Sequence, residues 1–600
     1  MKLHYNPSTD SKSNSNWDAI VIGAGLGGLS AAAYLAASGK RTLLLERYSV
    51  LGGSSHIFRR QKKWEFDCGV HYIGDCGPKG PVPTLLRGLG LDDRIEWLPF
   101  DTQAFDTIIG PDLELQVPWG WEQYLENLIR AFPREERGLR FYVAVMKRIA
   151  DSIKRADSTT GASAFAGLAA RAGWAAPWLL VPHAALLAAC RFSPKTILAL
   201  SVQDGAIAST PLAVPVMMRA VFLHDYVGGG AWYPKGGGQI LAAGFGEVIQ
   251  SHDGEIRTQV HVDRIVIEGG RAIGVRLADG EVIKAPAIIA AGDIKRTYRE
   301  LVGFENLPRS VARRSDNWKM SHPLINGFFG VELDLSKTPN SNYYVIPNWD
   351  AASSVLGLQR TVGRLVTSAS GRDPLEWAND FAKNQPAFIQ CSTRHDPYNK
   401  RSAPPGHSAI EAQTIVPADP RLWGFEGYDV AKGTYRRDAR YQAIKEIISE
   451  GLLARIEQAY PGAAAKVRWN ELGSPASQER FTHTSNGAAF GIEARVSQFG
   501  PFRPGTRTVI KGLFLAGAST AWGPGTEGAM LSGMHAASAV LGRDLQAEVS
   551  AGLVIADRSR LNTWPTDFDP YKATRMLGGK STMNLNDDEE VNAAPLINRC

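Results

Sequence analysis

Cysteine is scarce in this sequence, and its distribution argues against two classes of protein. The 600 residues include only Cys68, Cys76, Cys190, Cys391 and Cys600, and no two of them have CxxC spacing. A sparse, odd set of this kind argues against a disulfide framework and for a reducing, cytoplasmic compartment. The set also provides no zinc pattern, so we expect no metal site.

Strong charge of one sign and long apolar runs are also missing. The net charge is +6, with 44% hydrophobic and 21% charged residues, which is typical of a soluble globular protein. A dedicated nucleic-acid binder would carry clustered basic residues, so we expect no nucleic-acid partner. The segment Ala172–Cys190 has no charged residue, but Pro177 and Pro182 interrupt it. A spanning helix needs about 20 apolar residues, so we expect either a membrane-associating gate or a helical core.

A GxGxxG motif lies between two short apolar runs near the N-terminus. Trp17–Ile22 predicts a buried strand, Gly23–Gly28 forms the motif, and the Ala-rich run up to Ser38 predicts a helix. In a βαβ unit the three glycines permit the tight turn, close approach of a pyrophosphate and close helix packing. The helix N-terminus then offers N–H groups to the phosphates. Glu46 ends the second strand about 20 residues further on, where it either binds an adenosine ribose or is a plain surface acid.

A second glycine pair and a C-terminal motif narrow the ligand to FAD. Gly52 and Gly53 follow the second strand, and the long ribityl–flavin arm of FAD needs such a close backbone approach. At the other end of the chain, Gly512–Gly517 predicts another buried strand, and a helix is predicted to begin near Gly528. The dipole of that helix would face the flavin pyrimidine, where reduction places negative charge. The alternative is a loop and a core strand with ordinary glycine packing.

These motifs resemble those of the phytoene desaturase, carotenoid isomerase and retinol saturase family of flavoproteins. The matching stretches are Asp18–Ala32, Leu44–Arg47, Gly52–Gly53, Phe66–Gly74, Tyr233–Gly237, Val262–Ile265, Gly487–Gly491 and Gly512–Gly533. Of these, Phe66–Gly74 (FDCGVHYIG) is most similar to the saturase and isomerase branch. The resemblance implies an FAD-dependent oxidoreductase that desaturates, saturates or isomerises carbon–carbon bonds of a carotenoid- or retinoid-like polyene lipid. The insertions, which would determine the substrate, match only loosely.

The order of the apolar and glycine-rich blocks predicts two interleaved domains. The predicted fold class is α/β with α+β insertions, a Rossmann-type FAD-binding domain of the glutathione-reductase and amine-oxidase kind. This domain is expected to comprise residues 17–110, 225–300 and 470–545. A substrate domain of mixed sheet and helices is expected from residues 111–224 and 301–469, including the segment 172–190. Residues 1–16 and 546–600 are polar and are predicted to be a disordered lead-in and a mostly disordered tail.

Two residues are candidates for catalysis, and each has a structural alternative. His71 could donate a hydrogen bond to the flavin or to a developing carbanion, or it could order a loop. Glu527 could move a proton, or it could be a first-turn acid that the helix dipole favours. The predicted cofactor-binding residues are Gly23, Gly25, Leu26, Gly27, Gly28, Glu46, Arg47, Gly52, Gly53, Ser54, His71, Val262, Gly517, Ala518, Glu527, Gly528, Ala529 and Met530.

Two other functions share this arrangement of motifs. A flavin amine oxidase would need an aromatic cage beside the flavin, and Trp522 follows the C-terminal motif. A non-enzymatic escort of prenylated GTPases would have a degraded C-terminal motif, and here that motif is intact. The expected substrate is a hydrophobic polyene or isoprenoid, and peripheral membrane association is compatible with the small positive charge.

Overall fold

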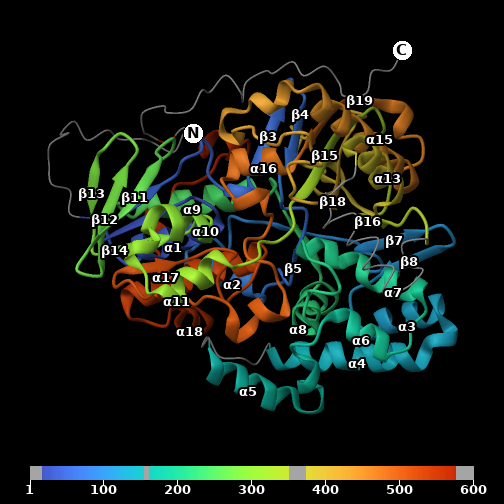
Figure 1. The fold of residues 1–600 in the computed structure, drawn as a ribbon, viewed down its shortest axis with the longest axis horizontal. Coiled ribbons are helices and arrows are strands. Elements are labelled where there is room, and N and C mark those ends of the chain that lie inside the picture. The colour runs from blue at the N-terminus through green and yellow to red at the C-terminus, as the bar shows by residue number, and fades with distance from the viewer. Residues whose placement is uncertain (1–16, 154–160, 350–372, 576, 578–600) are drawn as a thin grey trace.

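A parallel five-stranded sheet forms one half of the molecule, in the order β10-β2-β1-β14-β20 (Figure 1). The structure is a computed structural model that describes residues 17–153, 161–349, 373–575 and 577. The five strands are β1 (Ala19–Ile22), β2 (Thr42–Leu45), β10 (Glu255–Arg257), β14 (Ala287–Ala290) and β20 (Leu513–Leu515). The predicted lead-in at residues 1–16 lies outside the described residues.

The two faces of this sheet are covered by different elements, and β1 shows how the sequence divides between them. Ala19 and Val21 pack in the core formed with the helices α1 (Leu26–Ala37), α9 (Gln239–Ser251) and α17 (Thr526–Leu541). Ile20 and Ile22 point to the opposite core, because successive side chains of a strand alternate. That core includes the antiparallel sheet of β11 (Val262–Glu268), β12 (Arg271–Leu277) and β13 (Val282–Lys284).

A seven-stranded mixed sheet forms the second half, in the order β19-β15-β18-β17-β16-β7-β8. Its strands are β7 (Asp106–Gly110), β8 (Leu113–Val117), β15 (Leu324–Val331), β16 (Asn342–Val345), β17 (Ala387–Cys391), β18 (Ser408–Ile415) and β19 (Val467–Gly473). Only the β16–β7 pair is parallel among these described strands. The helices α13 (Pro374–Asn384) and α15 (Ala439–Ala459) pack on it and share its core.

A group of helices lies beside β7 and the edge strand β8 (Figure 1). They are α3 (Trp121–Ala131), α4 (Glu136–Ile153), α5 (Ala162–Ala172), α6 (His183–Ala189), α7 (Pro194–Ser201) and α8 (Val216–Leu223). The smaller elements are β3 (Ile57–Arg60), β4 (Trp64–Asp67), β5 (Ile73–Gly74), β6 (Trp97–Pro99), β9 (Ala231–Pro234), α2 (Pro81–Gly88), α10 (Ile294–Arg296), α11 (Arg309–Asp316), α14 (Ser392–His395), α16 (Pro475–Thr482), α18 (Leu545–Ser550) and α19 (Pro570–Ala573).

Two of the predicted domain limits are wrong. The range 17–110 includes β7, and the range 470–545 includes the end of β19, but both strands belong to the seven-stranded sheet. A short strand has the same alternating pattern in the sequence whichever sheet it joins. The domain boundary therefore depends on the pairing partners of the strand, which the pattern does not identify.

The prediction that residues 546–600 are mostly disordered is wrong for residues 546–575. This stretch contains the end of α18 and all of α19. Leu577 is also fixed, because its N–H donates to Thr258 Oγ1 at 2.9 Å and its carbonyl accepts from Thr258 N at 3.0 Å. The polar composition that suggested disorder instead supplies hydrogen bonds to the body of the protein. Residues 578–600 lie outside the described residues.

Candidate active site

The first glycine motif forms the turn between β1 and α1, and its glycines are needed for different reasons. Gly23 has φ +97°, which favours glycine. A Cβ at Gly28 would lie 1.9 Å from the Gly23 carbonyl oxygen, so Gly28 permits close helix–strand packing. A Cβ at Gly25 would meet nothing within 4 Å, so the N-cap of α1 faces open space. Leu26 is buried in the core behind the turn. The motif thus presents bare backbone N–H groups, as a pyrophosphate requires.

The second glycine pair lies directly on the first motif. Gly52 N–H donates to the carbonyl of Ala24 at 2.8 Å, and Gly25 and Gly52 form a parallel bridge. A Cβ at Gly53 would lie 2.9 Å from Gly25 Cα, so no larger residue fits here without a shift. The next residue, Ser54, is exposed and lines the cavity described below. We call the backbone of these two motifs the glycine cradle. It is narrow, and side chains at its glycine positions would fill it.

The C-terminal motif brings a second helix N-terminus beside α1. A Cβ at Gly27 would lie 2.8 Å from Gly517 Cα, and Ser30 Oγ donates to the carbonyl of Met530 at 2.8 Å. Gly517 has φ +97°, and Gly528 lies in the first turn of α17. The α17 N-cap has no side-chain hydrogen bond, so the first N–H groups of this 16-residue helix are available to a ligand. The predicted residues Ala518 and Ala529 flank this approach of the two helices.

Glu46 lies at the end of β2, and backbone groups hold its carboxylate. Its Oε2 accepts from Ala24 N and its Oε1 from Tyr48 N, each at 2.6 Å. Burial raises the pKa of Glu46, and these two hydrogen bonds oppose the shift. The carboxylate therefore holds the glycine turn in shape. Arg47 donates to the carbonyls of Arg480 and Phe481, and Val262 is buried at the start of β11.

A cavity of about 650 Å³ extends from this cradle into the substrate half. At the cofactor end its wall includes Gly69, His71, Glu527 and Gly528, and at the other end it includes Phe165. Its wall is mostly apolar, and its volume falls within the range of about 300–1,000 Å³ that small-molecule sites occupy. Within the described residues no group of His, Cys, Asp and Glu is arranged to hold a metal ion.

His71 lies in the cavity wall as a neutral imidazole. Its Nε2 is 2.5 Å from Nε2 of Gln413, which leaves the amide as the donor and places the ring proton on Nδ1. Burial lowers the pKa of His71 to about 3, so the ring stays neutral. Its Nδ1 is buried without a hydrogen-bond partner among the described residues. A buried, unsatisfied donor beside the glycine cradle fits an acceptor supplied by a bound cofactor or substrate.

Glu527 lies in the first turn of α17 and faces the same cavity. Burial and the nearby Asp75 carboxylate raise its pKa to about 8, because both disfavour a second negative charge. In most molecules the Glu527 carboxyl group is therefore protonated at neutral pH. A neutral carboxylic acid can donate a proton, whereas an ionised first-turn acid would only complement the helix dipole.

A polyene substrate predicts an aromatic-lined pocket, but the residues that form this wall were not predicted. The ring of Tyr72 lies against that of Tyr226 in a tilted arrangement with centroids 4.3 Å apart, and its hydroxyl lies 3.1 Å from that of Tyr344. Behind them, burial raises the pKa of Asp106 to about 7, and Gln203 donates to its carboxylate at 2.7 Å. Tyr72 adjoins the predicted His71 and could have been found from that motif. Tyr344 lies in the second predicted insertion and Tyr226 just after the first, where no local pattern marks the cavity-facing side.

Arg503 is another residue that was not predicted, and it donates hydrogen bonds to the backbone of the C-terminal motif. Its guanidinium is buried and donates to the carbonyls of Ala518 at 2.6 Å, Thr520 at 2.7 Å and Ile492 at 3.0 Å. Burial lowers its pKa to about 9. The sequence around it shows no recognisable motif, so only the folded chain reveals that it holds this turn.

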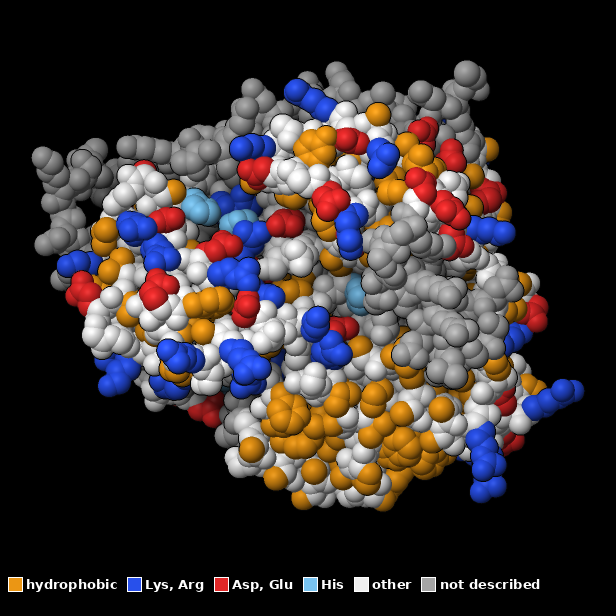
Figure 2. Space-filling view, in the orientation of Figure 1, with side chains coloured by type: hydrophobic (Ala, Val, Ile, Leu, Met, Phe, Trp, Pro, Cys, Tyr) orange, Lys and Arg blue, Asp and Glu red, His pale blue; other side chains and the backbone are white. Residues whose placement is uncertain are grey.

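The segment Ala172–Cys190 was predicted as either a gate or a helical core, and part of it is packed in the core. Ala172, Leu186 and Leu187 are buried in the helical core, whereas Trp174 is 55% exposed. Within the part of the chain that the structure describes, no helix combines the length and the apolar character that a membrane crossing needs. Figure 2 shows apolar side chains gathered over the helices at this end of the molecule.

Comparison with known proteins places these features in a class. Residues 21–89 match a family described as NAD(P)-binding Rossmann-like domain, and residues 402–541 match one described as flavin containing amine oxidoreductase. The chain is 25% identical to all-trans-retinol 13,14-reductase of Danio rerio, over 88% of this chain and 87% of that protein. It is also 25% identical to prolycopene isomerase 1, chloroplastic, of an Oncidium hybrid cultivar, over 91% and 87% of the two chains.

Solved structures share the fold. Cyclohexylamine oxidase from Brevibacterium oxydans superposes with a TM-score of 0.56 at 16% identity, covering 88% of this chain and 99% of that one. Putrescine oxidase bound to putrescine superposes with a TM-score of 0.57 at 13% identity and the same coverage. The glycine cradle, the paired helix N-termini and these matches define an FAD-dependent oxidoreductase. The predicted α/β fold class, the FAD cofactor and the family resemblance are confirmed.

Proposed function

We propose that this chain is an FAD-dependent oxidoreductase that acts on carbon–carbon double bonds of a polyene lipid. The observation that carries the proposal is the lining of the cavity: it is largely apolar, starts at Ser54 beside the second glycine pair and at Gly528, and continues past an aromatic wall. A carotenoid- or retinoid-like chain has few polar groups, so its affinity comes from buried apolar area at roughly 25 cal/mol per Å². Retinol reductase and prolycopene isomerase relatives support the same substrate class.

The residues of the cradle would hold the cofactor. Backbone N–H groups around Gly25 and Gly53 would bind the pyrophosphate, Glu46 the ribose, and the α17 N-terminus at Gly528 the flavin pyrimidine. When bound, FAD supplies the hydride acceptor or donor. The protein then contributes orientation, exclusion of water and control of a proton.

Two side chains are proposed to act on the substrate. Glu527, whose pKa is raised to about 8, would deliver or remove the proton that balances hydride transfer to or from a double bond. His71, held as the Nδ1–H tautomer by Gln413, would donate a hydrogen bond to the flavin or to developing negative charge. Saturation, desaturation and isomerisation all use this set of residues and differ in the redox state from which they start.

We also propose that substrate enters from a membrane surface. Phe141, Trp174 and Phe502 are exposed large apolar side chains, and we call them the apolar face. Phe141 and Trp174 lie in contact, with ring centroids 6.2 Å apart. Phe502 ends the short helical turn Gly500–Phe502, and Gly500 and Pro501 line the far end of the cavity. An exposed apolar patch continuous with a lipid-shaped cavity is suited to peripheral membrane binding.

The test is anaerobic incubation of the flavin-loaded protein with retinol, carotenoids and simple amines. Bleaching of the oxidised flavin by a polyene, with a product two hydrogens lighter, supports desaturation. Return of the flavin absorbance when the chemically reduced protein meets a polyene, with a product two hydrogens heavier, supports saturation. A shifted retention time without a mass change supports isomerisation. Bleaching by amines alone would contradict the polyene proposal and favour a flavin amine oxidase.

A further inference from the structure

The end of the described chain returns to the glycine cradle. We call residues 569–575 the C-terminal strap. Leu51 N–H donates to the carbonyl of Thr574 at 3.1 Å, and Val50 pairs with Arg575 in an antiparallel bridge. The strap therefore lies against the residues that immediately precede the second glycine pair, on a turn that also contacts the first glycine motif.

One buried amide joins the strap to this turn. Gln239, at the start of α9, is fully buried, and its Nε2 donates to the Leu51 carbonyl at 2.9 Å and to Thr574 Oγ1 at 2.7 Å. Its Oε1 accepts from Ile57 N at 3.0 Å. Thr574 Oγ1 in turn donates to the Pro570 carbonyl at 2.7 Å. This amide thus bonds residues before and after the glycine pair and the strap, and loss of one partner would leave a buried donor unsatisfied.

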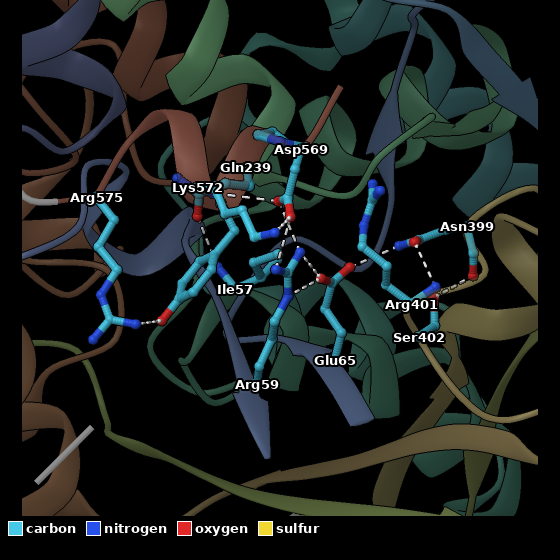
Figure 3. A network of polar contacts seen from close by, with 12 residues as sticks. Ile57, Arg59, Glu65, Gln239, Asn399, Arg401, Ser402, Asp569, Lys572 and Arg575 are labelled. Atoms are coloured by element: carbon cyan, nitrogen blue, oxygen red, sulfur yellow. Dashed lines mark hydrogen bonds and ion pairs between the residues drawn. The ribbon is translucent and has the colours of Figure 1, made fainter. Parts of the chain in front are cut away.

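A charged contact fixes the start of the strap, as Figure 3 shows. Arg59 on β3 donates to both carboxylate oxygens of Asp569 at 2.9 and 2.8 Å and also to Glu65 at 2.7 Å. Asn399 donates to the other oxygen of Glu65 at 2.7 Å. Burial opposes ionisation of Asp569, but the bonds from Arg59 outweigh it and lower its pKa. A bidentate arginine–carboxylate pair that is partly buried fixes the relative position of its two partners more strongly than a surface ion pair does.

An aromatic side chain of the strap fills the space between these two contacts. Tyr571 is buried against Val50 and Ile57, which flank the turn on both sides. The Arg59 guanidinium lies 4.9 Å from the centre of its ring. Tyr571 also contributes to the cavity wall beside Tyr48. The strap therefore contacts the turn through its backbone, through a buried amide and through apolar packing.

We propose that the C-terminal strap is a positioning element for FAD: it holds the Leu51–Gly53 turn against Gly25 and thereby sets the affinity for the cofactor. The inference rests on the proposed cofactor role of Gly52 and Gly53. None of Gln239, Asp569 and Thr574 was predicted as a site residue. Each of them acts through the turn, so they are positioning residues.

Two substitutions in the full-length protein test this inference. Thr574→Val keeps the shape of the side chain but removes the acceptor of the Gln239 amide, and Asp569→Asn weakens the Arg59 contact. Each is expected to raise the FAD dissociation constant of the flavin-free protein at least fivefold, measured by flavin fluorescence titration. Amide hydrogen exchange of residues 51–55 in the flavin-free protein is expected to become faster. Asp569→Glu is expected to restore part of the affinity.

Matched controls change similar contacts elsewhere. Thr338→Val removes a hydroxyl that donates to the Leu335 carbonyl at 2.8 Å. Asp253→Asn breaks a 2.9 Å ion pair with Arg560, which also lies in the C-terminal region but does not contact the turn. Both controls are expected to change the FAD dissociation constant less than twofold.

The outcomes separate the strap from the cofactor assignment. If Thr574→Val and Asp569→Asn lower the midpoint of thermal unfolding but leave FAD affinity within twofold of wild type, the strap is only structural and the inference is wrong. If the wild-type protein fails to bind FAD at all, the cofactor proposal itself fails. A reduced FAD-induced rise in the unfolding midpoint, together with faster exchange at residues 51–55, supports the inference.

Discussion

Replacing Glu527 by Gln is expected to stabilise the flavin-free protein at neutral pH and to lower its activity. The folded state holds the pKa of Glu527 at about 8, against 4.5 for the free side chain. Below pH 4.5 the group is protonated in both states and has no effect on relative stability. As the pH rises towards 8, the unfolded chain ionises first, and the folded state loses stability by up to about 1.36 kcal/mol per pH unit. Gln carries no such penalty.

The size of this effect follows from the two pKa values. Between pH 4.5 and pH 7 the accumulated difference is about 3 kcal/mol in favour of Glu527→Gln, and it levels off above pH 8. Loss of the proton donor should at the same time reduce the rate of polyene turnover by roughly 10²–10⁴-fold. The variant should therefore be more stable and less active than wild type. A substitution that only damaged the core would lower the stability as well as the activity.

Urea unfolding of the flavin-free protein at pH 5, 6, 7 and 8 measures the stability difference, and anaerobic flavin bleaching measures the rate. Glu122→Gln is the matched control, because Glu122 is an exposed acid in the first turn of another helix, α3. A stability difference for Glu527→Gln that stays constant with pH, or equals that of the control, would refute the reasoning about burial and Asp75.

Four further substitutions, with one control, separate packing, cofactor binding and membrane binding. Gly28→Ala should destabilise the protein strongly, because its Cβ would lie 1.9 Å from a carbonyl oxygen. Gly25→Ala should leave the thermal unfolding midpoint unchanged and weaken FAD binding, because a Cβ there meets no atom within 4 Å. Equal unfolding midpoints for the two variants would contradict this. Glu46→Ala should lower the flavin content after gel filtration, and full retention would count against its role at the ribose. Trp174→Ser should reduce sedimentation with anionic vesicles, while Tyr398→Ser, at another exposed aromatic, should not.

The sequence predicted the glycine turns because their signals are local. The functions of Gly23, Gly25 and Gly28 follow from backbone geometry over a few residues, and the structure places each as that geometry requires. The proximity of Gly517 to Gly27 could be expected only because both motifs suit one ligand. Such positions require glycine, so the residue type itself indicates the backbone geometry.

The substrate side could not be predicted in the same way. Tyr226 and Tyr344 reach the cavity through sheet pairing and helix packing that join distant segments, and no short pattern encodes those contacts. Strand β7 was assigned to the wrong half because alternation does not identify a pairing partner. Residues 546–575 were predicted to be part of a disordered tail, because polar composition does not reveal that Asp569 has a half-buried arginine partner.

The strand order of the parallel sheet has a consequence for biosynthesis. Neighbouring strands β1, β14 and β20 come from residues near 20, 288 and 514, so the sheet gains its last strand only after most of the chain has left the ribosome. Until then the edge of β14 that receives β20 is open, and the helix that completes the cradle, α17, has not been made. Open strand edges invite wrong pairing. The two glycine motifs and the N-terminus of α17 can therefore come together only late in synthesis, and the edge of β14 stays open until then.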